Sequence, residues 1–416
     1  MGQKRRQVFW GQHVFFISMF ISVFISSALL AAVDFFSCPV SLAAEEKTAA
    51  ALPLTQPLEK QLEELDFAQV ERTVEEMRGE IGDYLPHFSF RQMLEELMQG
   101  HISWTLKELM QGVLRYLFRE VVANSALLAQ LVVLAVLCAV IGHLGAAFEA
   151  GTVGRLAQGV CYLALLTLAL GSFLLAVEVG RGAIERMLSL VQALVPLLLT
   201  LMAALGGFTS VAFLHPFIAA SLAVLSNLIG QVVFPLIFFS AALSMVNQLS
   251  DRFQVSRLAG FLRQASIWLT GLIMTLFIGV LAVQGAMGAV ADSVALRTAR
   301  FAAGTFIPVV GGAFAEALDT VLGYGLLLKN SIGFLGLIII FLFCLFPVLK
   351  ILAVVIAFKV AAVLIQPMGD ERTAEALQQI AGSLGLVMIT VAAVGLMFFM
   401  TVGIILGAGT LTVMLR

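Results

Sequence analysis

The chain of 416 residues is 60% hydrophobic and only 12% charged, and its mean hydropathy is +1.02. These values lie outside the range of soluble domains, so the sequence indicates an integral membrane protein. The formal net charge of -2 comes without a dense basic stripe and gives no indication of a nucleic-acid partner. The four cysteines are dispersed and form no CxxC pair, which argues against a disulfide framework and a zinc site.

The N-terminus has the pattern of an export signal. Basic residues 4–6 precede an apolar run over 14–33, which is followed by the small residues of Ser41-Leu42-Ala43-Ala44. We predict a signal peptide over residues 1–43, cleaved near Ala43 or Ala44. An uncleaved signal anchor is the alternative.

Residues 44–125 form an acidic segment, with 15 acidic and 8 basic side chains. Apolar residues recur at helical spacing over 58–77 and again over 93–117, and the stretch from Gly79 to Pro86 separates the two patterns. If the leader is exported, this segment is extracytoplasmic. We predict short amphipathic helices that lie on the membrane surface or pack on a partner.

Residues 126–416 contain charge-free runs that are too long and too unbroken for the strands of a membrane barrel. We therefore predict an all-α, polytopic membrane domain of about nine or ten helices. The expected spans lie near 126–148, 156–177, 188–206, 211–229, 232–247, 266–288, 331–349, 351–365 and 384–412. The polar segment 248–264 carries three arginines and one aspartate, which places it in the cytoplasm after five crossings.

The segment 289–329 is rich in glycine and is interrupted by Pro308. It fits either a re-entrant segment over 301–328 or a tenth span over 301–321. Gly311 and Gly312 suit a tight turn or a close helix approach. Irregular backbone at membrane depth survives only inside protein or beside a water-filled cavity, so this region is the leading candidate for the functional centre.

Five ionisable residues stand in or near these apolar spans. Glu316 and Asp319 are three residues apart and share a helical face, where they could pair with Lys329, Lys350 or Lys359. Lys329 and Lys350 are equally consistent with helix ends that extend their amines to the interface. Lys359 has long apolar flanks on both sides, so it is the strongest candidate for a buried or functional cation.

Signatures of enzymes are missing from the sequence. It contains no GxxxxGK[ST] loop, no HExxH helix and no complete GxSxG turn. We therefore predict no catalytic residues, no cofactor and no metal, and we expect any energy to come from an ion gradient or a partner.

Several long segments of the chain are far more specific than a single short motif. They include RYLFREVVANSALLAQL at 115–131, VQGAMGAVADSVALRTAR at 283–300, FIPVVGGAFAEALDTVL at 306–322, CLFPVLKI at 344–351 and IQPMGDER at 365–372. In these segments the chain resembles the stage III sporulation protein AE family of endospore-forming bacteria. The resemblance covers nearly the whole chain. Ala315-Glu316-Ala317 departs from an expected serine-rich stretch, which weakens a special role for Glu316.

The resemblance implies a polytopic protein of the mother-cell-derived membrane that surrounds the forespore. Its implied partners are the other stage III A proteins, including the AA ATPase and the ring-forming AG and AH, with forespore stage II protein Q reached indirectly. The implied assembly is a channel or secretion-like apparatus needed for late forespore gene expression. Three functions stay open: a channel subunit in which residues 301–365 line or gate the passage, a stand-alone secondary transporter, and a membrane scaffold.

Overall fold

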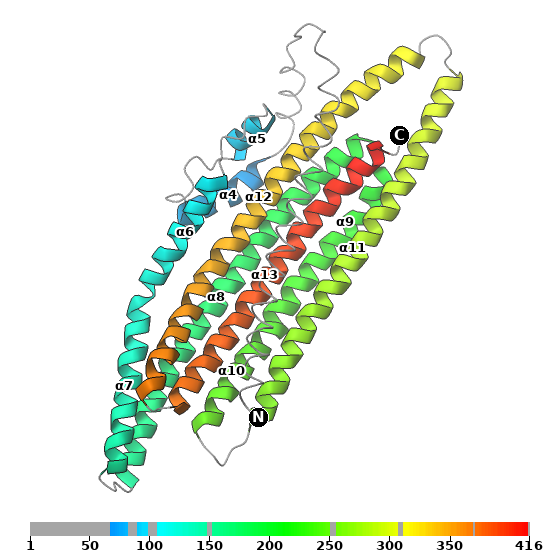
Figure 1. Cartoon of the computed structure of the whole chain (residues 1–416). Helices are drawn as coiled ribbons and strands as arrows, with labels where there is room; N and C mark the ends of the chain where they lie inside the picture. The colour runs from blue at the N-terminus through cyan, green and yellow to red at the C-terminus, as the bar shows by residue number, and fades with distance from the viewer. Residues whose placement is uncertain are drawn as a thin grey trace.

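The computed structural model describes residues 67–81, 90–98, 106–147, 152–249, 255–306, 311–368 and 371–414. Every regular element within these ranges is a helix, which confirms the predicted all-α class. The signal peptide predicted over 1–43 lies outside them. The long helices run side by side and form an elongated bundle (Figure 1).

The elements follow one another in a simple order. They are α4 (Ala68–Ile81), α5 (Phe90–Met98), α6 (Leu106–Ala123), α7 (Ser125–Ala147), α8 (Thr152–Ala204), α9 (Phe208–Leu228), the π-helical turn η1 (Ile229–Val233), α10 (Phe234–Leu249), α11 (Ser256–Phe306), α12 (Gly311–Ile365), the 3-10 turn η2 (Gln366–Met368) and α13 (Glu371–Met414). Six segments of the described chain are long and apolar enough to cross a membrane: Gln111–His143, Leu156–Ala204, Phe208–Val246, Ser256–Ala295, Gly325–Ile365 and Arg372–Ala408. The protein is therefore a multi-pass membrane protein.

Six such segments in the described residues stand where nine or ten spans were expected, because pairs of expected spans lie on one continuous helix. The spans near 156–177 and 188–206 are both parts of α8, and those near 331–349 and 351–365 are both parts of α12. The chain also stays helical from α9 through η1 into α10. Three long segments then precede residue 249 in place of five. An odd number of crossings places residues 248–264 on the opposite side of the membrane from residues 44–125, and three crossings have the same effect as five. The cytoplasmic placement of 248–264 therefore stays a prediction.

Residues 301–328 include the junction between two long helices. Helix α11 continues to Phe306 and α12 begins at Gly311, so this stretch consists of the adjoining ends of two long helices and the short connection 307–310. The connection lies outside the described residues. The structure therefore shows helical backbone on both sides of this connection, and the predicted re-entrant segment or tenth span stays a prediction.

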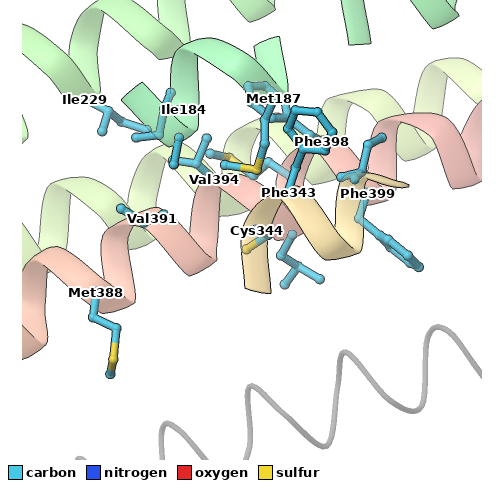
Figure 2. Close-up of a cluster of buried hydrophobic side chains, with 14 of the residues drawn as sticks. Ile184, Met187, Ile229, Phe343, Cys344, Met388, Val391, Val394, Phe398 and Phe399 are labelled. Atoms are coloured by element: carbon cyan, nitrogen blue, oxygen red, sulfur yellow. The ribbon is translucent and has the colours of Figure 1, made fainter. Parts of the chain in front are cut away.

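Helices α12 and α13 form the centre of the bundle. In the most apolar window of α13, 72% of the residues are buried inside the protein, and in that of α12 61% are, whereas the other four segments reach at most 33%. Figure 2 shows part of this core, where Met187 of α8 meets Phe343 and Cys344 of α12 and Phe398 of α13. The remaining long helices surround this pair.

Glycine permits the close approach of α12 and α13 at one point of this core. A Cβ atom on Gly395 would collide with Cys344 Sγ, whereas a Cβ atom on Gly403 of the same helix would meet nothing within 4 Å. We expect Gly395→Ala to lower the free energy of unfolding by about 1–3 kcal/mol, because the core must shift. Gly403→Ala is the matched control and is expected to be neutral or to stabilise by up to about 1 kcal/mol. Thermal unfolding of the detergent-purified protein compares them, and equal effects would contradict this packing.

The two short helices of the predicted acidic segment pack on the bundle of their own chain. Val70 and Val74 of α4 are buried, as are Phe90 and Leu94 of α5, and α4 contacts α8 while α5 contacts α12. The rings of Phe67 and Phe90 lie 5.6 Å apart and join the two helices. Figure 1 shows α4, α5 and α6 together along one flank of the bundle. Their apolar faces therefore have an intramolecular partner.

Candidate functional site

Lys329 lies in the interior of the bundle, on α12. Its side chain is 0% exposed, and its Nζ donates a hydrogen bond of 2.9 Å to the carbonyl oxygen of Leu406 on α13. Among the side chains that the structure describes, no carboxylate forms an ion pair with this ammonium group. A Cβ atom on Gly333, one turn further along α12, would meet the side chain of Leu406, so the two helices are in close contact here. Lys329 therefore points inward and does not extend to the interface.

Asp292 is the second charged residue in the interior, and it caps a helix. Its side chain is 1% exposed, and its two carboxylate oxygens accept hydrogen bonds from the backbone N–H groups of Thr209 (2.7 Å) and Ser210 (2.9 Å). These N–H groups belong to the first turn of α9, and the N–H groups of a first turn have no acceptor within their own helix. A carboxylate at this end also interacts favourably with the helix dipole. Asp292 thus joins α11 to the start of α9.

Glycine shapes the turn that presents these N–H groups. Gly206 has a φ of 87°, in the left-handed region that favours glycine, and the N–H of Gly207 donates to Met202 O at 2.9 Å. On α11, a Cβ atom at Gly288 would lie 2.7 Å from the Cα atom of Ser210. Small residues on both helices therefore let α11 approach closely enough for Asp292 to reach the turn.

These features gather at one end of the bundle, where α8 ends, α9 begins and α13 approaches its C-terminus (Figure 1). A Cβ atom on Gly325 of α12 would lie 2.9 Å from Leu205, which brings α12 to the same end. We call this region the buried polar end. It is defined by Asp292, Lys329 and three buried side-chain oxygens that have no hydrogen-bond partner in the described structure: Ser210 Oγ, Gln284 Oε1 and Asn330 Oδ1.

The two charged groups of the buried polar end hold neighbouring helices together. Both charged groups bind backbone groups of a neighbouring helix, so Asp292 holds α11 to α9 and Lys329 holds α12 to α13. A buried charge with a neutral partner is costly, because a single carbonyl replaces only part of its hydration. The region therefore contributes less stability than its hydrogen bonds suggest.

The other two candidate lysines of α12 lie on the surface of the chain. Lys350 and Lys359 are both exposed, so neither is the buried cation that the sequence suggested for Lys359. Pro347 lies within α12, and the helix continues past Lys350 to Ile365. Of the three lysines, only Lys329 reaches the buried polar end.

The remaining candidates belong to the beginning of α12 or precede it. Gly311 and Gly312 form its first turn, and Glu316 and Asp319 follow on the next turns of the same helix. The contacts of these four residues are not among those described, and Pro308 lies in the connection outside the described residues. The structure thus places these four positions on one helix and leaves their predicted pairing as a prediction.

Sequence reasoning missed Arg181 of α8 as well as Asp292. The N–H of Phe234, the residue after η1, donates to Ile229 O, five residues back. The next bond of this type would run from residue 235 to Gly230 O, and it would require an N–H from Pro235. Proline has none, which leaves Gly230 O without that donor. Arg181 Nη2 donates to this oxygen at 2.8 Å. The sequence signal for Asp292 was a lone carboxylate after a long charge-free run, and that for Arg181 was a proline at membrane depth.

Comparison with known proteins adds the family. The family model described as Stage III sporulation protein AE matches residues 88–409, which include Asp292, Lys329 and Leu406. The chain belongs to the stage III sporulation protein AE family.

A stage III sporulation protein AE of Bacillus subtilis (strain 168) is 40% identical to this chain over 337 residues, which cover 81% of this chain and 84% of that protein. The family resemblance inferred from the sequence is confirmed. No solved structure matches the chain. The description of the stage III sporulation protein AE family names a sporulation protein and no class of enzyme.

Proposed function

We propose that the protein is a non-enzymatic, multi-pass subunit of the channel or secretion-like complex that links mother cell and forespore, and that late forespore gene expression needs it. It works in the mother-cell-derived outer forespore membrane with the other stage III A proteins, including the AA ATPase and the AG and AH ring proteins, and indirectly with stage II protein Q. Residues 44–125 are extracytoplasmic in this proposal. Membership of the stage III sporulation protein AE family supports it.

The observation that carries the proposal is the length of an exposed apolar face on α11. Its large apolar side chains extend from Leu258 to Val294, about 54 Å along the helix axis at about 1.5 Å per residue. They are Leu258, Phe261, Ile267, Trp268, Leu272, Leu276, Val280, Val283, Met287, Val290 and Val294.

One bilayer does not cover this face. The hydrocarbon core is about 30 Å thick, and a helix tilted by about 40°, the upper end of the usual range, passes about 39 Å of its length through it. The exposed apolar side chains from Phe208 to Val246 on α9, η1 and α10 span a similar length, about 57 Å. Exposed apolar surface beyond the bilayer requires protein neighbours, which favours a complex subunit over a stand-alone permease.

Co-purification tests the proposal. A tagged, full-length chain isolated with mild detergent from sporulating cells is expected to retain other stage III A proteins, identified by mass spectrometry. The same tagged chain, expressed in non-sporulating cells and mixed with their lysate, is the control for non-specific binding. Recovery of the chain alone, together with gradient-dependent solute uptake by liposomes that contain it, would instead identify a secondary transporter.

A further inference from the structure

The exposed face of α8 differs from every other exposed face described above. Between residues 178 and 200, the side chains that α8 exposes are Glu178, Arg181, Glu185, Ser189, Gln192, Pro196 and Thr200. All of them are polar except proline, and none is a large apolar residue. We call these seven residues the α8 polar stripe.

The stripe lies on one side of α8. Its members follow one another at intervals of three or four residues, so they share a face. The opposite side of the same stretch is buried in the core through Met187, Leu190, Leu194 and Leu198. The polar residues therefore do not mark an interruption of the helix, since they define a second surface of it.

The length of the stripe matches the thickness of a membrane. Glu178 and Thr200 lie about 33 Å apart along the axis, and the hydrocarbon core is about 30 Å thick. Over a comparable length, α11 exposes Trp268, Leu272, Leu276 and other apolar side chains. One face of the bundle thus suits lipid, while the α8 polar stripe does not, because charged and amide groups are the most costly ones to expose to lipid.

The groups of the stripe are held in place by the protein. Arg181 is fixed by its hydrogen bond to Gly230 O, and the hydroxyls of Ser189 and Thr200 donate to Glu185 O (3.0 Å) and Pro196 O (2.8 Å) of their own helix. Each hydroxyl oxygen keeps lone pairs that face outward and can accept hydrogen bonds from water. Three polar groups of the stripe are therefore fixed on the exposed side of α8.

We propose that the α8 polar stripe lines a water-filled passage for small hydrophilic solutes across the membrane. The inference rests on the proposed function, because one helix face is a single wall and neighbouring subunits supply the rest. Charges of both signs at Glu178, Arg181 and Glu185 stand at one end, and neutral hydroxyl and amide groups cover the remaining length. This composition hydrates a passage without selecting one sign of charge. It moves the passage from residues 301–365, expected from the sequence, to α8.

Cysteine accessibility tests this inference in the full-length chain, after its own four cysteines are replaced by alanine. Gln192→Cys and Thr200→Cys place a thiol on the stripe, and Leu276→Cys places one on the apolar face of α11. In membranes from sporulating cells, a charged thiosulfonate reagent is expected to modify the two stripe positions at least about tenfold faster than Leu276→Cys, because only a hydrated thiol ionises and reacts readily.

A nitroxide on the same cysteines separates the outcomes. We expect the nitroxides on the stripe to collide mainly with a water-soluble nickel complex. We expect the nitroxide at residue 276 to collide mainly with oxygen, which concentrates in lipid. Oxygen collisions at both faces would show that the stripe contacts lipid, and protection from both probes would show that a protein covers it; either result overturns the inference. If the chain retains its partners in the co-purification but the stripe cysteines do not react, the inference is wrong and the proposed function remains supported. If the stripe cysteines react but the chain is recovered without partners, the proposed complex is wrong and the hydrated stripe remains supported.

Discussion

Lys329→Met is expected to yield a protein at least as stable as the wild type that nevertheless supports sporulation poorly. The ammonium group lies fully buried against one neutral carbonyl oxygen, Leu406 O, so the variant removes a desolvated charge and keeps most of the side-chain volume. Lys329→Ala leaves a cavity instead and is expected to lower the free energy of unfolding by about 2–4 kcal/mol. Thermal unfolding in detergent and the yield of heat-resistant spores measure the two effects.

Lys350→Met is the matched control for this pair, since Lys350 is exposed on the same helix. It is expected to change stability little. A loss of stability in Lys329→Met as large as that in Lys329→Ala would show that the bond to Leu406 stabilises the fold outright. Normal spore yield with a stable Lys329→Met protein would remove Lys329 from the functional residues.

Asp292→Ala is expected to lower the free energy of unfolding by about 3–5 kcal/mol, a large part of the stability of a typical domain. The variant removes two charge-assisted hydrogen bonds and leaves the N–H groups of Thr209 and Ser210 buried without an acceptor. Asp292→Asn keeps one acceptor oxygen and is expected to fall between Asp292→Ala and the wild type. Thermal unfolding ranks the three proteins.

Thr298→Ala is the control for helix α11, because Thr298 is exposed and its hydroxyl bonds only to Val294 O of its own helix. Hydrogen exchange gives a local readout. In Asp292→Ala, the amides of residues 209 and 210 are expected to exchange faster than in the Thr298→Ala protein. Unchanged exchange at these two amides would contradict the capping role of Asp292.

Hydropathy predicted the class of the protein but divided its helices in the wrong places. Windows of about 20 residues average over all sides of a helix, so the charges at Glu178, Arg181 and Glu185 were interpreted as a loop between two spans. Their spacing keeps them on one side, while Ile184 and Met187 of the same stretch are buried on the other. Checking whether the charged residues share one helical face would have favoured a continuous α8.

The continuity of α9, η1 and α10 could not be predicted from their own residues. The charge-free run that contains them is long enough for several tightly connected spans, so the sequence predicted separate spans near 211–229 and 232–247. The helix is continuous in the structure, and a side chain of α8, 49 positions earlier in the sequence, donates to the carbonyl oxygen that Pro235 leaves without its donor. Only the tertiary structure places that guanidinium beside Gly230.

The candidate site was predictable in kind but not in detail. The sequence shows that cations at membrane depth need a special environment, which holds for Lys329. Which of three lysines is buried depends on Leu406, which is 77 positions away, and the role of Asp292 depends on a turn 83 positions earlier. Neither of these long-range contacts can be predicted from the residues near Lys329 or Asp292 in the sequence.

The burial of α12 and α13 has a consequence for the biogenesis of the protein. These two helices follow α8, α9 and α11 in the chain, so the inner surfaces of those three helices are synthesised before their partners exist. Asp292 can reach the α8–α9 turn as soon as α11 is made, whereas Lys329 must remain in the membrane until residue 406 has been synthesised. Packing of the bundle core thus waits for the synthesis of α13, and a nascent protein that stops before α13 lacks one of its two most buried helices.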